Sequence, residues 1–249
     1  MNIQHLFNFK TDLSGINTPD KLNNPFGLEI PEIARIATSE FQEFIVSESK
    51  KWKSDFSTLK GKMFGVLVVQ KKDKSIGYLG TVSGKLPENS TCSKFVPSVF
   101  DDSTDDFFIS KGMKELTEIG IKISESDDQS EIIELTESRK LKSFGLQQRL
   151  FESYHFLNLL GEKNSVLQIF KNSTHSNPPA AAGECAAPKL LQYAFTHQLK
   201  PIAIAEFWWG TPSKNKEREH KAFYPSCKNK CRPILEYMLD NRNLFIEAS

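Results

Sequence analysis

The sequence predicts an α/β fold in which a mixed sheet is flanked by helices, and three observations support this prediction. Two apolar runs, MFGVLVVQ (63–70) and PIAIAEFWW (201–209), are typical of buried strands. Apolar residues recur at helical spacing in other segments, most clearly over 32–52. With 249 residues and 39% hydrophobic positions, the chain can bury a large core without disulfides.

The local pattern justifies each element in turn. The first expected helix, 32–52, follows Pro31, and proline suits the start of a helix. A charged turn separates 63–70 from 76–84, which indicates a β-hairpin, and SVLQIF (165–170) is expected to be a further strand. Three more helices are expected at 141–160, which ends at Gly161, at 187–199 and at 231–240.

Charge is unevenly distributed along the chain, although Lys+Arg 32 and Asp+Glu 31 nearly cancel. Residues 101–137 contain twelve acidic residues and three lysines, so an acidic, helical and partly flexible insertion is expected over about 101–140. The first 31 residues are expected to form an extended lead-in to a single domain covering 1–249. The near-neutral total excludes a uniformly basic coat for nucleic acid.

Membrane insertion and export are both disfavoured. No apolar run approaches the roughly 20 residues that a membrane helix needs. The first residues do not show a basic segment followed by an apolar stretch, as a secretory signal would. We therefore expect a cytoplasmic protein without a membrane partner, whose four cysteines are reduced thiols or metal ligands.

Cys185, Cys227 and Cys231 are predicted to bind zinc, which takes three or four sulfur or nitrogen ligands from converging segments. Each lies near the start of an expected helix, where thiolates are favoured. The loop 210–224 is long enough to bring the helix starts together. His220 is the only histidine considered as a fourth ligand. The alternative is three ordinary buried thiols, because free cysteine is often buried and C-x3-C is not the usual C-x2-C zinc motif.

The order of helix, strand and cysteine-led helix resembles the core of zinc deaminases. Their signature is H-x-E followed by P-C-x-x-C, in which the glutamate moves protons for a zinc-bound water. Here Glu184 precedes Cys185 instead of following it by two positions, and Ser226 separates Pro225 from Cys227. Cys227 and Cys231 are also separated by three residues, one more than in the C-x-x-C of the signature. A deaminase-like zinc enzyme with Glu184 as the catalytic residue therefore remains an alternative.

A basic segment near the end of the chain is predicted to bind RNA. Cations beside Trp208 and Trp209 suit phosphate contacts and base stacking. The alternative is a solvated loop with both tryptophans in the core. The cations are Lys214, Lys216, Arg218, Lys221, Lys228, Lys230 and Arg232.

Long blocks throughout the chain resemble, in order, the N-terminal region of a subgroup of RluA-type RNA pseudouridine synthases. The blocks are GKMFGVLVVQ (61–70), GYLGTVSGKL (77–86), KFVPSVFD (94–101), LQQRLFESYHFLN (146–158), PPAAAGECAAPKLLQYAF (178–195), KPIAIAEFWWG (200–210) and FYPSCKNKCRPILEYML (223–239). The catalytic domain of that family carries an aspartate in an R-L-D-type motif, which this chain lacks.

The resemblance implies a non-catalytic module that binds RNA or positions the substrate for pseudouridine synthesis on tRNA or rRNA. Its expected partners are RNA and a pseudouridine synthase catalytic domain. Two other functions remain open, the deaminase-like enzyme and a protein-interaction domain.

Overall fold

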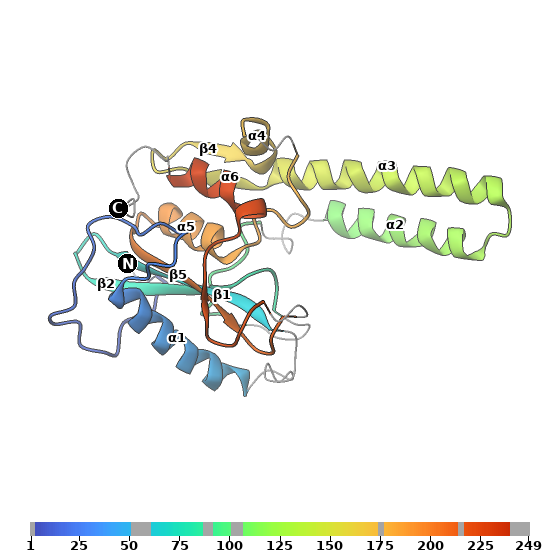
Figure 1. The fold of residues 1–249 in the computed structure, drawn as a ribbon. Helices are drawn as coiled ribbons and strands as arrows, with labels where there is room; N and C mark the ends of the chain where they lie inside the picture. The colour runs from blue at the N-terminus through green and yellow to red at the C-terminus, as the bar shows by residue number, and fades with distance from the viewer. Residues whose placement is uncertain are drawn as a thin grey trace.

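The computed structural model describes residues 3–50, 61–86, 92–100, 107–173, 177–213 and 217–239. Its central sheet has the strand order β2-β1-β5-β6 (Figure 1). The α/β class with helices flanking a sheet is confirmed, but every strand pair in these residues is antiparallel rather than mixed. The strands of the central sheet are β1 (Lys62–Gln70), β2 (Ile76–Val82), β5 (Lys200–Trp209) and β6 (Phe223–Tyr224).

Helix α1 (Glu32–Ser49) covers one face of this sheet (Figure 1). Its apolar side chains recur three and four positions apart, so they form one buried stripe. Phe41 lies at the centre of the stripe, with its ring 6.4 Å from those of both Phe64 and Phe207. The predicted helix over 32–52 is therefore confirmed as far as Ser49, and residues 51–52 lie outside the described ranges.

The opposite face is covered by α5 (Ala186–Thr196) and α6 (Lys228–Leu239), which confirm the helices expected at 187–199 and 231–240 with small shifts. Side chains of a strand alternate between the two faces, and β1 and β5 obey this rule. Leu67 and Ile204 therefore pack beneath α5, whereas Val66 and Ala205 pack against α1.

The strand expected at 165–170 is instead the short helix α4 (Val166–Lys171). Ser165 caps it, because its hydroxyl accepts a hydrogen bond of 3.2 Å from the backbone N–H of Gln168. A short apolar run fits a buried helix as well as a strand, and the cap decides between them here. Beside α4, β3 (His155–Leu157) and β4 (Lys163–Ser165) form a small antiparallel pair.

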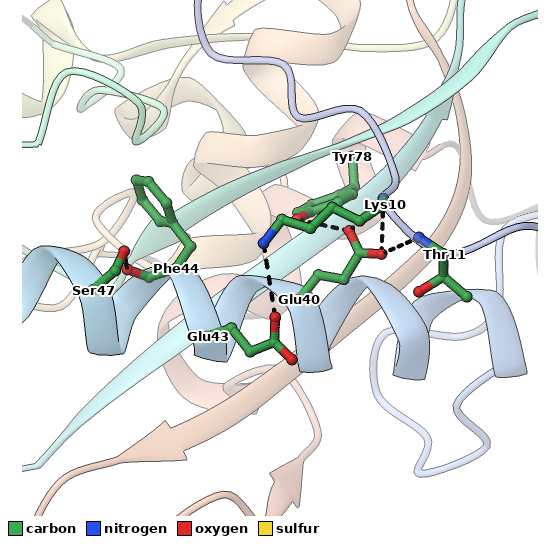
Figure 2. Close-up of polar contacts among 7 residues, drawn as sticks. All are labelled: Lys10, Thr11, Glu40, Glu43, Phe44, Ser47 and Tyr78. Atoms are coloured by element: carbon green, nitrogen blue, oxygen red, sulfur yellow. Dashed lines mark hydrogen bonds and ion pairs between the residues drawn. The ribbon is translucent and has the colours of Figure 1, made fainter.

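The lead-in to α1 is anchored to the sheet and to α1 by backbone contacts. Phe7 forms an isolated antiparallel bridge with Tyr78 of β2. The carboxylate of Glu40, only 5% exposed, accepts hydrogen bonds of 2.9 and 3.1 Å from the N–H of Lys10 and of 2.8 Å from that of Thr11 (Figure 2). A carboxylate inside α1 thus fixes the path of the preceding chain.

The acidic insertion, which was expected to be helical and partly flexible, forms two long helices, α2 (Phe107–Glu125) and α3 (Gln129–Ser153). They pair as a hairpin, hereafter the arm, that extends away from the sheet (Figure 1). Asp128 caps α3 by accepting a hydrogen bond of 2.8 Å from the N–H of Ser130. The predicted start at 141 and end at Gly161 were wrong, and residues 101–106 lie outside the described ranges.

Candidate functional site

Three residues in register across the sheet determine where the cysteines lie. Glu206 of β5 pairs with Gly65 of β1 on one side and with Tyr224 of β6 on the other. The start of α5 packs over Gly65, where an added Cβ would lie 2.9 Å from the Cβ of Ala186. The segment after Tyr224 leads directly into α6. The turn that carries β6 thus returns the chain to β5 and brings the two helix starts together.

This arrangement brings together the three cysteines that the sequence singled out. Cys185 is the N-cap residue of α5, Cys227 directly precedes α6, and Cys231 lies in the first turn of α6. Each thiol is hydrogen-bonded to the other two. Cys231 is fully buried, whereas the other two are half-buried.

The environment shifts the pKa values of the three thiols in opposite directions. Hydrogen bonds from Cys185, from Cys231 and from N–H groups at the start of α6 hold the pKa of Cys227 far below its usual range. One of these N–H groups, that of Lys230, lies 3.4 Å from Sγ of Cys227. The hydrogen bond to Cys227 raises the pKa of Cys185 to about 12, and contacts with both other thiols and burial raise that of Cys231.

No group of three or more His, Cys, Asp or Glu side chains in the described ranges has an arrangement that could hold a metal ion. The three cysteines interact with one another in this structure. His220 does not join them, because its Nδ1 accepts a hydrogen bond of 3.1 Å from the N–H of Gly210 and its ring packs against Trp209.

Glu206 is the carboxylate that accompanies the thiols, and the sequence analysis did not identify it. Its side chain points to the α5 face, where it is 6% exposed. It accepts hydrogen bonds of 2.6 Å from the hydroxyl of Ser226 and of 3.3 Å from the N–H of Ala187. Burial raises its pKa, and these two hydrogen bonds oppose the shift. The available signal was a single charge inside the otherwise apolar run PIAIAEFWW.

Glu184, the catalytic candidate of the deaminase alternative, bonds to different groups. Its carboxylate accepts hydrogen bonds from the hydroxyls of Tyr154 and Ser98, the latter at 3.3 Å. Its electrostatic contact is with Lys189, whereas Glu206 raises the pKa of Cys185 and of Cys231, and Cys227 raises the pKa of Glu206. The hydrogen bonds of Glu184 are thus made to Tyr154 and Ser98, and its catalytic role in the deaminase alternative stays a prediction.

The lead-in closes the space beside Glu206. Asn23 donates to the C=O of Ile204 at 3.0 Å and accepts from its N–H at 2.8 Å, and the N–H of Ser226 donates to the C=O of Pro25. These contacts leave a cavity of about 10 Å³. Such a volume holds about one water molecule and excludes a nucleobase.

The predicted RNA surface is only partly as expected. Trp208 and Trp209 are 8% and 7% exposed, so neither can stack on a base. Arg218 already covers the ring of Trp208 at 5.2 Å, and Lys221 covers that of Trp209 at 5.7 Å. The base-stacking part of the prediction is therefore wrong, because both rings of β5 are buried. Lys214 and Lys216 lie outside the described residues.

The remaining cations surround β6 and the start of α6. Lys228 and Arg232 are exposed and Lys230 is half-buried. Arg232 pairs with Glu236 at 2.7 Å. Within the described part of the chain, no ion pair involves Arg218, Lys221, Lys228 or Lys230. Their charges are thus available to an anionic ligand.

Comparison with known proteins gives no family for this chain. No family model matches the sequence, and no curated protein or solved structure matches it significantly. Among the described helices, none combines the length and the apolar character that crossing a bilayer requires.

Proposed function

We propose that this chain is a non-catalytic module that contacts RNA for an RluA-type pseudouridine synthase, and that zinc bound by Cys185, Cys227 and Cys231 organises its contact surface. The observation that carries the proposal is the mutual contact of the three thiols at the starts of α5 and α6. Lys228 and Lys230, two of the cations proposed to contact RNA, lie at the start of α6.

The residue types of this donor set suit zinc. Their side chains would have to rearrange to bind it, because their present arrangement is not that of a metal site. Zinc sites are commonly built from cysteine thiolates that short segments bring together, and three protein ligands are sufficient. The helix starts supply N–H groups that favour thiolates, as the N–H of Lys230 does for Cys227. Loading requires the hydrogen bonds among the thiols to be replaced and protons to be released. Bound zinc would fix α6 relative to α5 and with it the position of Lys228 and Lys230.

The unpaired cations support RNA contact through phosphate groups. Arg218 and Lys221 lie against the aromatic rings of β5, while Lys228 and Lys230 extend the positive surface along α6. Since the tryptophans are buried, binding should depend on charge rather than on base identity. The resulting affinity should be sequence-tolerant and strongly reduced by salt.

The zinc part is tested by adding zinc to the reduced, metal-free protein in competition with a chromophoric chelator. We expect one zinc per chain, with binding strongly weakened in Cys227→Ser and Cys231→Ser. Cys92→Ser is the matched control, because Cys92 packs on the opposite face of the sheet. Equal zinc binding by the wild type and Cys227→Ser would refute the assignment.

The RNA part is tested by fluorescence anisotropy with a tRNA transcript over a range of salt concentrations. Replacing Lys228, Lys230 and Arg232 by alanine should weaken binding and lower the salt slope by a little under one unit for each lost phosphate contact. The control replaces Lys72, Lys163 and Lys171, three exposed lysines on other elements. No affinity of the wild type at low salt, or equal losses in both triple variants, would contradict RNA contact here.

One observation favours a hydrolytic zinc site of the deaminase type as a second candidate. The H-x-E signature places a glutamate two residues after the first ligand. Ala187 occupies that position here, and its N–H donates to the carboxylate of Glu206. Glu206 thus supplies a carboxylate from β5 where the signature supplies one from the helix. Cytidine or adenosine deamination by the zinc-loaded protein that disappears in Glu206→Gln would replace the non-catalytic proposal.

A further inference from the structure

The arm exposes more apolar surface than the rest of the described chain. Only Leu116 of α2 and Phe151 of α3 are buried apolar residues there. Nine large hydrophobic side chains are exposed in the described residues, and five of them lie on the arm: Met113, Ile121, Ile133, Leu141 and Phe144. Two helices that pack only on each other cannot cover all of their apolar side chains. The exposed apolar residues of the arm are therefore candidates for a docking face.

Three of these five side chains lie on the outer face of α3. Ile133, Leu141 and Phe144 are 62%, 64% and 57% exposed, and their spacing of eight and three residues keeps them within one helical stripe. The inner face of α3 is identified by its contacts with α2. Lys142 pairs with Glu115 at 2.9 Å, and Arg139 donates to the C=O of Leu116. Ile133 and Leu141 lie on the other side of the helix, and Phe144 lies at the edge of the stripe, where it also lines a pocket with Gly120 and Ile123 of α2.

Charge along the arm changes sign between its tip and its base. Residues 118–137, around the tip, contain seven acidic residues and one lysine. Residues 107–117 and 138–153, nearer the body, contain six basic and two acidic residues. Two arms laid antiparallel would place each acidic tip beside the basic base of the other. Parallel arms would juxtapose like charges.

We propose that the outer face of α3 docks onto the same face of a second copy of this chain. The two α3 helices run antiparallel and are related by a two-fold axis that passes near residues 138–139. In this register Ile133 lies opposite Phe144 of the second copy. Glu137 lies opposite Lys140 of the second copy, and both contacts occur twice because such an interface is self-complementary. α3 is about 37 Å long at 1.5 Å per residue, which is enough for the whole stripe.

The charges of the stripe favour a second copy over nucleic acid as the occupant. Glu131, Glu134 and Glu137 lie along the tip half of α3 and would repel phosphates. The opposing Lys140 forms only a long, exposed contact of 3.9 Å with Glu137 of its own helix. Replacing this contact by a Glu137–Lys140 contact between the two copies should therefore cost little free energy.

Sedimentation velocity of the full chain over a range of concentrations tests the proposal. We expect a concentration-dependent dimer that Ile133→Glu with Phe144→Glu makes monomeric. Met113→Glu with Ile121→Glu is the matched control, because it adds the same two charges at exposed positions of α2 and should leave the dimer unchanged. Circular dichroism establishes that each variant keeps its helices. A monomer at every concentration, or a dimer that persists in the Ile133→Glu, Phe144→Glu variant, overturns the proposal.

A charge exchange tests the register independently. Glu137→Lys alone places two lysines opposite each other at both symmetry-related contacts, so dimerisation should weaken by several-fold. Adding Lys140→Glu restores opposite charges and should restore the dimer. Equal dimerisation of the wild type and both variants would exclude this antiparallel register.

Discussion

Ser226 donates a hydrogen bond of 2.6 Å to Oε2 of Glu206 and so connects the residue before Cys227 to the central strand. Both side chains are buried, at 3% and 6% exposure. A buried carboxylate without such donors is strongly destabilising, so this contact helps to fix the start of α6 on the sheet.

Removing this donor should therefore destabilise the fold. Ser226→Ala leaves the buried Glu206 with one fewer donor, and the expected loss in the free energy of unfolding is about 1–3 kcal/mol. Urea denaturation at neutral pH measures it. Ser47→Ala is the control, because that exposed serine bonds only within α1 and should change stability by less than about 0.5 kcal/mol. Equal stability of both variants would contradict the role given to Ser226.

The close approach of α5 to β1 predicts that Gly65 cannot be enlarged without cost. In Gly65→Ala the new methyl group would lie 2.9 Å from the Cβ of Ala186, so one backbone must move. The expected loss is about 1–3 kcal/mol in thermal or urea unfolding. Gly145→Ala, in α3 with nothing within 4 Å, should instead stabilise by about 0.5–1 kcal/mol. If both substitutions stabilised the protein, helix propensity or chain entropy would dominate over the contact with Ala186.

Glu40 and Glu43, one helical turn apart, should differ in their effect on the lead-in (Figure 2). Glu40→Ala removes the acceptor for two backbone N–H groups and for the hydroxyl of Tyr78, so stability should fall by about 1–3 kcal/mol. It should also speed tryptic cleavage after Lys10. Glu43→Ala removes only an exposed ion pair of 3.7 Å and should cost less than about 1 kcal/mol. Unchanged cleavage in Glu40→Ala would mean that other contacts hold the lead-in.

His220 should make stability fall as the solution becomes acidic. Burial lowers its pKa below 6.5, with a smaller contribution from Lys221. Below pH 6.5 His220 is therefore protonated more readily in the unfolded chain than in the folded chain. Its contribution to stability is complete above pH 6.5 and declines as the pH falls below it. Protonation also removes the lone pair that accepts from Gly210. The free energy of unfolding of His220→Gln should show a shallower slope between pH 7.5 and 5.5 than that of the wild type, and equal slopes would contradict this.

The sequence by itself determined the elements whose pattern is local and long. The runs that became β1 and β5, and the helices α1, α5 and α6, could be predicted because alternation and 3.6-residue periodicity select the buried face of each element. The same patterns placed Cys185, Cys227 and Cys231 at helix starts. They failed at α4, where the apolar run is too short to separate a helix from a strand, and in the arm they predicted helical structure but not the bounds of the two helices.

Tertiary structure alone decided which of these groups meet. The pairing of Gly65, Glu206 and Tyr224 across the sheet brought the thiols together and placed Glu206 beside them. The burial of Trp208 and the closure of the site by the lead-in came from contacts between segments far apart in the chain. A local pattern specifies which side of a helix or strand is buried. Which other element packs on that side depends on surfaces built from distant segments, and a short stretch of sequence does not contain that information.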